Sequence, residues 1–169
     1  MDTSETITQF AKMLNNLDRW LEAGSAFAEK KKFEPDVLAQ SRLAPDQYPL
    51  ARQVQSACDA AKYAAAYLSG QKAPSHPDTE KTLDELRGRI RTCVRYLESV
   101  GPSEYGGARD KRVAPPWLQG KWFRGADYLA QLAVPNFYFH VTTAYAILRH
   151  NGVDLGKMDF IGSIPTHEG

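Results

Sequence analysis

Four long stretches of the sequence carry apolar residues at intervals of three and four, the spacing that gathers them on one face of an α-helix. The first two stretches show it most clearly, with Ile7, Phe10, Leu14, Leu17 and Leu21 in one, and Leu50, Val54, Ala57, Ala61, Ala65 and Leu68 in the next. Each stretch must bury its apolar face against another. The sequence therefore predicts an all-α fold, a four-helix bundle, in a single domain over residues 1–169.

Helix-start and helix-stop residues suggest the boundaries. The first helix is expected from Ser4 to Glu29, with Ser4 or Thr3 as its cap. A polar link with one short helical turn near Val37 and Leu38 follows. The second helix is expected to begin near Pro49 and to end at Gly70, because proline suits a first helical turn and glycine suits a helix end.

Two further helices complete the prediction. The sequence SHPD at 75–78 resembles a capping box with aspartate in the acidic position, so the third helix is expected to follow it and to stop at Gly101. The last helical region is expected to begin near Asp127, to be broken at Pro135 and to end at Asn151-Gly152.

The connection over residues 102–124 is too long to be a simple loop. Its pieces KRVA (111–114) and GKWF (120–123) could pair as a short β-ribbon. Its aromatic residues Trp117, Trp122 and Phe123 favour a packed flap over a disordered tail.

The formal net charge is only +1, so the chain as a whole has no field that would draw it to nucleic acid or to anionic lipid. The uncharged stretch from Tyr128 to Leu148 is long enough to span a membrane, but its polar residues favour a central helix of a bundle. We expect Cys58 and Cys93 to be reduced thiols in separate core positions. With no export signal at the N-terminus, a cytoplasmic location is expected.

The second helix has an apolar surface besides its core stripe. Ala60, Tyr63 and Tyr67 project from the opposite side, and such a face needs cover. A second copy of the chain could supply it, which predicts a homodimer, or the aromatic flap could cover it within one chain. Asp59 is expected on the outer face, in solvent.

The segment PNFYFHVTTAYAILRHNG at 135–152 holds the most distinctive histidine of the chain. His140 falls beside the core-facing stripe, on one side with Asn136 and Thr143, where a small polar pocket would form. Gln55 is the candidate from the second helix. We expect His140 to be buried against a polar partner, because an unpaired imidazole would cost on the order of 1–3 kcal/mol. It could be a structural hydrogen-bonding group, a small-molecule ligand or a metal ligand.

The combination of RLAPDQYPLARQVQSACDAAK at 42–62 with PNFYFHVTTAYAILRHNGVDLGKMDFIG at 135–162 resembles a bacterial family catalogued only as a domain of unknown function. That family lies within the DinB/YfiT-like superfamily of metalloenzymes. The resemblance implies a four-helix bundle, often dimeric. It also implies a metal held by three histidines, one from the second helix and two spaced HxxxH near the start of the fourth.

This sequence keeps one of those three histidines. The second histidine of HxxxH falls on His140, but the first falls on Asn136, and residues 49–70 contain no histidine. We therefore expect no metal and no other cofactor. Three functions remain open: a metal-dependent or altered transferase or hydrolase of the DinB/YfiT type, a non-catalytic binder of a small molecule, and a structural or interaction dimer.

Overall fold

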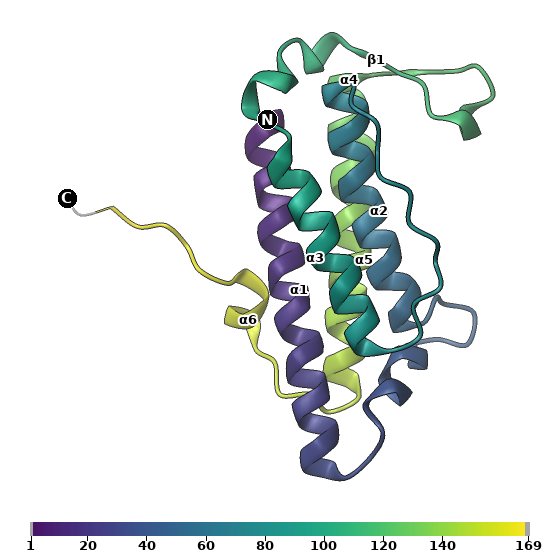
Figure 1. Cartoon of the computed structure of the whole chain (residues 1–169), viewed down its shortest axis with the longest axis vertical. Coiled ribbons are helices and arrows are strands. Elements are labelled where there is room, and N and C mark those ends of the chain that lie inside the picture. Colours follow the sequence, from purple (N-terminus) through teal and green to yellow (C-terminus); the bar gives the residue numbers. More distant parts are fainter. Residues whose placement is uncertain (1, 168–169) are drawn as a thin grey trace.

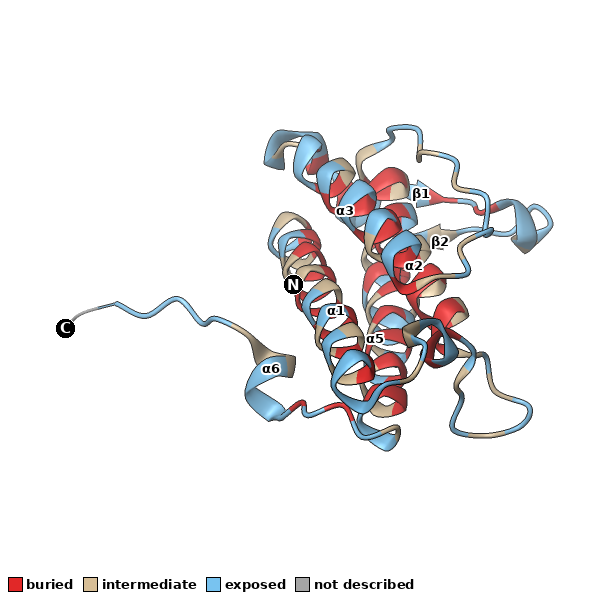
Figure 2. Ribbon diagram, turned by 60° about the horizontal axis from the view of Figure 1, so that its bottom comes forward, coloured by how far each residue is buried: buried red, intermediate tan, exposed pale blue. Residues whose placement is uncertain are grey.

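Four long helices lie side by side in the computed structural model, which describes residues 2–167 (Figure 1). They are α1 (Thr3–Lys31), α2 (Leu50–Ser69), α3 (Leu83–Ser99) and α5 (Val134–His150). Their buried faces meet along the axis of the bundle, whereas their exposed faces point outward (Figure 2). The all-α prediction is confirmed.

The stripe on α1 forms one wall of this core. Ile7, Phe10, Leu14 and Leu17 are all buried, and the Phe10 ring stacks on Phe137 of α5 with ring centroids 4.1 Å apart. The expected cap was wrong by one or two residues. The side chain of Asp2, not of Thr3 or Ser4, accepts a hydrogen bond from the backbone N–H of Glu5.

The third helix begins later than expected, and the path of the chain explains why. Figure 1 shows that α2 and α3 run in the same direction, so the chain must return along the whole bundle between them. A helix of 20 residues such as α2 spans about 30 Å. Extended chain covers about 3.3 Å per residue, so a third helix starting soon after 75–78 would leave too little chain for the return.

Thr82 provides the cap instead of SHPD. Its hydroxyl accepts a hydrogen bond from the backbone N–H of Glu85, and the Glu85 carboxylate accepts one from the backbone N–H of Thr82, which completes a capping box. The segment 70–82 is thereby left free to run as an extended crossover.

A cluster of charges holds this crossover against α2 and α3. Arg89, only 4% exposed, lies 2.7 Å from Asp59, 3.0 Å from Asp78 and 3.2 Å from Glu80. Lys62, 1% exposed, lies 2.8 Å from Asp59. The expectation that Asp59 is solvated was therefore wrong, because the crossover covers this part of α2 and brings cations to it. Buried charges of this kind are tolerated only when paired.

The two cysteines also lie closer together than expected. Both are free and buried, but Cys93 donates a hydrogen bond from its Sγ to the backbone oxygen of Cys58, 3.3 Å away, across the α2–α3 contact. The hydrogen bond with Cys93, together with burial, raises the pKa of the Cys58 thiol. The thiols are neighbours in one part of the core.

The last helical region is not broken at Pro135. The short helix α4 (Gly125–Tyr128) passes through a π-helical turn, η5 (Leu129–Ala133), directly into α5. The N–H of Val134 donates to the oxygen of Leu129, five residues back, and Pro135 then occupies the first turn of α5. The wider turn absorbs the proline, which has no N–H to donate.

The connection between α3 and α4 contains the expected ribbon. Strands β1 (Arg112–Val113) and β2 (Phe123–Arg124) pair antiparallel, with η4 (Pro116–Leu118) between them, after the short turns η2 (Pro102–Tyr105) and η3 (Ala108–Asp110). This flap extends beyond the end of the bundle near α4 (Figure 1).

Two further short elements pack beside the long helices. The turn η1 (Pro35–Gln40) contains the expected helical turn at Val37 and Leu38. Helix α6 (Lys157–Ile161) packs on α1, where the Trp20 Nε1 donates to the oxygen of Asp159. Within residues 2–167, no helix is both long and apolar enough to cross a membrane.

Candidate functional site

His140 lies on the side of α5 that faces α2. Its side chain is 8% exposed, and its Nδ1 lies 2.8 Å from the Oε1 of Gln53 on α2. Gln53 is itself fully buried. The structure therefore places His140 as the sequence predicted, buried against a polar partner from another helix.

The surroundings of Gln53 fix the tautomer of His140. The Gln53 amide nitrogen donates to the backbone oxygen of Tyr48, 3.1 Å away, so the amide oxygen is the atom that faces the imidazole. An amide oxygen can only accept, so Nδ1 carries the proton. In the neutral ring Nε2 then presents a lone pair, and it has no protein hydrogen-bond partner within residues 2–167.

The electrostatic environment favours that neutral form. Burial lowers the pKa of His140 below its ordinary value, and the positive charge of Arg52 lowers it further. A neutral, oriented imidazole with an available acceptor nitrogen can bind the donor group of a ligand or accept a proton.

A cavity of about 660 Å³ lies beside His140. Helix α2, the π-helical turn, the start of α5 and the flap all contribute to its walls. The lining residues are Ser56, Asp59, Ala60, Tyr63, Tyr67, Pro115, Pro116, Trp117, Tyr128, Leu132, Ala133, Asn136 and His140. Its volume lies within the range of small-molecule sites, which run from about 300 to 1,000 Å³.

The structure brings some of the predicted pocket residues together and separates others. Asn136 lines the cavity one helical turn before His140. Thr143 does not line it, and its hydroxyl donates to the backbone oxygen of Phe139 on its own helix. Gln55 does not line it either. Its amide donates to Glu80 at 3.0 Å, under the crossover.

The face with Ala60, Tyr63 and Tyr67 turns out to be a wall of the same cavity. Pro115, Pro116 and Trp117 of the flap lie on the cavity's rim, so the flap covers part of this face from within the chain. Tyr63 nevertheless remains 40% exposed.

Gln53 is the site residue that the sequence reasoning missed. It lies three residues after Leu50 and four before Ala57, both of the inner stripe, so helical spacing alone could have placed it inside. The flap was one of two covers that the sequence left open for the face with Ala60, Tyr63 and Tyr67, because no short-range pattern states which helix a long loop will contact.

The residues around His140 do not fit a metal centre of three histidines. Asn136 occupies the position one turn earlier, and a carboxamide is a poor zinc ligand. From α2, Gln53 contacts His140, and Ser56 and Asp59 line the same cavity. In the described part of the chain, no three His, Cys, Asp or Glu side chains are grouped so as to hold a metal ion.

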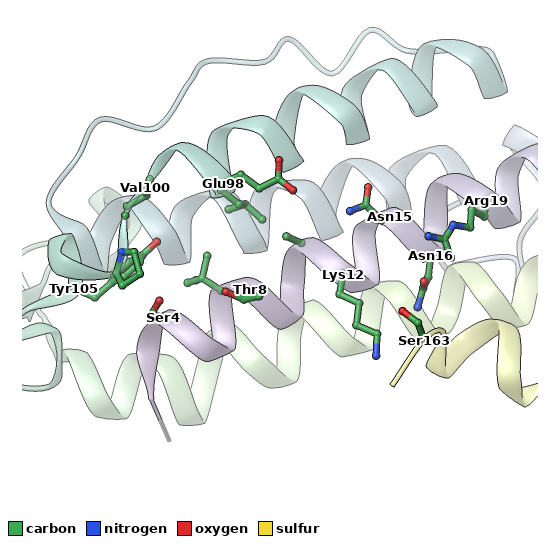
Figure 3. A pocket seen from close by; sticks show the side chains of 15 residues that line it. Ser4, Thr8, Lys12, Asn15, Asn16, Arg19, Glu98, Val100, Tyr105 and Ser163 are labelled. Carbon is green, nitrogen blue, oxygen red and sulfur yellow. The ribbon is translucent and has the colours of Figure 1, made fainter. Parts of the chain in front are cut away.

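A second cavity, of about 440 Å³, lies along α1 near the end of α3 (Figure 3). Polar side chains of α1 dominate one wall, among them Ser4, Thr8, Lys12 and Asn16, and Ser163 lies near Lys12 in this view. It contains none of the candidate residues, and within residues 2–167 no histidine lines it. The larger cavity with the oriented imidazole is the better candidate site.

Comparison with known proteins relates the chain to a protein family and to a solved structure. A family model described as "Domain of unknown function (DUF1993)" matches residues 3–161. The chain is also similar to the crystal structure of a DinB family member protein from Shewanella denitrificans, at 48% sequence identity and a TM-score of 0.92, over 96% of this chain and 93% of that one. No curated protein matches the chain.

The protonation of His140 is directly measurable. Because the folded protein disfavours the imidazolium, we expect His140 to titrate below the ordinary histidine pKa of about 6.5. The unfolded chain then binds this proton at higher pH than the folded one, so the free energy of unfolding should fall as pH drops below about 6.5. Imidazole NMR through a pH titration checks the midpoint, and the ¹⁵N shifts should report a proton on Nδ1.

Three variants help to assign and interpret this titration. His76 also has a lowered pKa, from burial and from Lys62, so His76→Asn is needed to assign the signals. Gln53→Met should remove the Nδ1 preference, whereas Gln55→Met, two residues along the same helix, should leave it unchanged. A midpoint for His140 at or above 6.5, or a proton on Nε2, contradicts the assignment.

Proposed function

Because this chain belongs to the family described as Domain of unknown function (DUF1993), we propose its function from the site alone: it is a DinB-like bundle protein that binds a small molecule in the His140 cavity. The binding uses protein groups only, without the three-histidine metal centre that the DinB/YfiT-like resemblance implies. We place this function in the cytoplasm, where thiols such as Cys58 and Cys93 stay reduced.

The observation that carries the proposal is the orientation of His140 at the cavity. A histidine with a purely structural role needs only its Gln53 hydrogen bond. Here the second ring nitrogen is left as an acceptor, and His140 is one of the residues that line a cavity of ligand size. The apolar and aromatic walls supply contact area, and one acceptor on a buried ring supplies orientation.

The same geometry supports a second candidate, an altered transferase or hydrolase. A general base needs an acceptor nitrogen and a group that holds the ring in one tautomer. Gln53 supplies the second requirement as a neutral counterpart of the carboxylate that often fills this role. Any ligand found in a fragment screen would then also be the first compound to test as a substrate.

A fragment screen tests binding directly. We expect ligand-observed NMR to find binders among small aromatic compounds that carry one hydroxyl or N–H donor. In His140→Phe, which keeps an aromatic ring and loses the acceptor, their affinity should fall at least about tenfold. His150→Phe, at the far end of the same helix and exposed, is the matched control and should bind normally.

A second cavity variant keeps the binding test informative whether or not His140→Phe folds. If His140→Phe fails to fold, Asn136→Leu replaces it, because Asn136 is exposed and lines the cavity. Absence of any binder to the unaltered protein, or equal binding by the cavity variants and the control, would falsify the proposal.

We also propose that two copies of the chain pair through the open side of this cavity, the face with Ala60, Tyr63 and Tyr67. The support is a set of exposed aromatic side chains at the cavity. Trp117 and Tyr63 line it and are 61% and 40% exposed, and the Phe139 ring, 54% exposed, lies 5.1 Å from the ring of His140. Exposed apolar groups gathered at one place commonly mark an interaction surface.

Sedimentation velocity at tens of micromolar measures the pairing. We expect the mass of a dimer for the unaltered protein and of a monomer for Phe139→Glu. Met158→Glu introduces the same charge at an exposed residue of α6, away from the cavity, and should stay dimeric. A monomer for the unaltered protein leaves the flap as the sole cover of this face.

A further inference from the structure

Among the described residues, the charged side chain in the wall of the His140 cavity is a carboxylate. Asp59 is the charged residue in its wall, and no lysine or arginine from the described part of the chain lines it. The other polar groups of the wall are the His140 imidazole, the Asn136 amide, the Ser56 hydroxyl and tyrosine hydroxyls. Within residues 2–167, the wall thus offers a ligand one carboxylate and several neutral polar groups, and it includes no lysine or arginine.

The ion pairs that Asp59 forms with Arg89 and Lys62 involve one of its two carboxylate oxygens. Arg89 and Lys62 both contact its Oδ1, at 2.7 and 2.8 Å. Across residues 2–167, no hydrogen bond reaches Oδ2. The side chain retains 28% of its exposure, and Asp59 lines the cavity. The carboxylate is thus held in place by buried cations while part of it stays accessible.

The aromatic walls form a continuous series of rings. Tyr63 and Tyr67 stack at 5.8 Å, and Tyr67 meets Tyr128 edge to face at 5.8 Å. Phe123 continues the series at 6.0 Å from Tyr128, and Trp117 follows at 6.2 Å from Phe123. Tyr67, Tyr128 and Trp117 line the cavity directly.

Such a wall attracts positive charge, because the face of an aromatic ring carries negative electrostatic potential. The chain already contains an example at the edge of the cavity. The ammonium group of Lys62 lies 4.7 Å from the centroid of the Tyr63 ring, within the range of a cation–π contact. An ammonium group from a ligand would find further ring faces and the Asp59 oxygen on the cavity side.

From these groups we infer that the cavity binds an organic ammonium ion, with its charge near Asp59 and the aromatic rings and a donor group on His140. The inference rests on the proposed function and names its ligand class. An anionic ligand would meet the Asp59 carboxylate and aromatic ring faces, and no lysine or arginine of residues 2–167 lines the wall to bind it. A neutral ligand would leave the carboxylate oxygen and the ring faces without a charged partner.

Comparing choline with 3,3-dimethyl-1-butanol isolates the effect of the ligand's positive charge on binding. The two molecules have nearly the same shape and the same hydroxyl donor, but only choline carries a positive charge. Titration of the full chain by NMR or calorimetry should give an affinity for choline at least about tenfold higher than for the alcohol. Such a preference supports the inference.

Substitutions in the cavity wall identify which residues cause the preference for choline over the alcohol. Trp117→Leu and Tyr67→Leu keep apolar surface but remove a ring, so each should weaken choline binding severalfold and leave the alcohol almost unchanged. Trp122→Leu is the matched control, because Trp122 is exposed on the same flap and does not line the cavity. It should bind choline normally.

Failure of the inferred ammonium specificity can be distinguished from failure of the proposed small-molecule binding. Equal affinity for choline and the alcohol overturns the ammonium class while leaving a small-molecule site in place. Binding of neither probe also overturns it, and the fragment screen then decides the proposed function on its own. A choline preference that survives both Trp117→Leu and Tyr67→Leu, or is lost equally in Trp122→Leu, places the charge recognition elsewhere and contradicts the inference.

Discussion

The close contact of α2 with α5 is the constraint on which the site depends. Small residues on the buried face of α2, including Ala57, Ala61 and Ala64, let the two backbones approach. This contact encloses a buried polar pair, Gln53 with His140. Farther along α2, Tyr67 meets Tyr128, and the cavity is lined by these tyrosines and by His140.

A second constraint comes from the direction of α3. Because α2 and α3 run in parallel, the chain needs the long crossover of residues 70–82, and an extended segment has few contacts of its own (Figure 1). Arg89 supplies them by binding Asp78 and Glu80 of the crossover as well as Asp59 of α2. Lys62 of α2 adds a contact of 3.3 Å to the Nδ1 of His76 on the crossover. Asp59 belongs to this cluster and to the cavity wall, so the feature that secures the crossover also sets the charge of the site.

Periodicity was enough to predict the four long helices, the ribbon and the burial of His140, because each depends on short-range spacing and on the cost of exposing apolar surface. It failed where distant parts of the chain decide the outcome. The capping sequence SHPD was plausible locally, yet the parallel course of α3 moved the cap to Thr82. The sequence predicted Asp59 to be in solvent, but the crossover covers this part of α2 and Arg89 lies 2.7 Å from the Asp59 carboxylate. The break expected at Pro135 was absorbed by a π-helical turn, which no local rule required.

A double-mutant cycle across the Gln53–His140 hydrogen bond tests the central claim most directly. Gln53→Met and His140→Phe each remove one partner and leave the other buried without it, so each should cost about 1–3 kcal/mol of unfolding free energy. The double variant removes both and should cost clearly less than the sum, with a coupling energy of about 1 kcal/mol or more. Unfolding in denaturant measures all four proteins. If the two costs add to within about 0.5 kcal/mol, the two side chains do not interact, and the oriented imidazole at the cavity is contradicted.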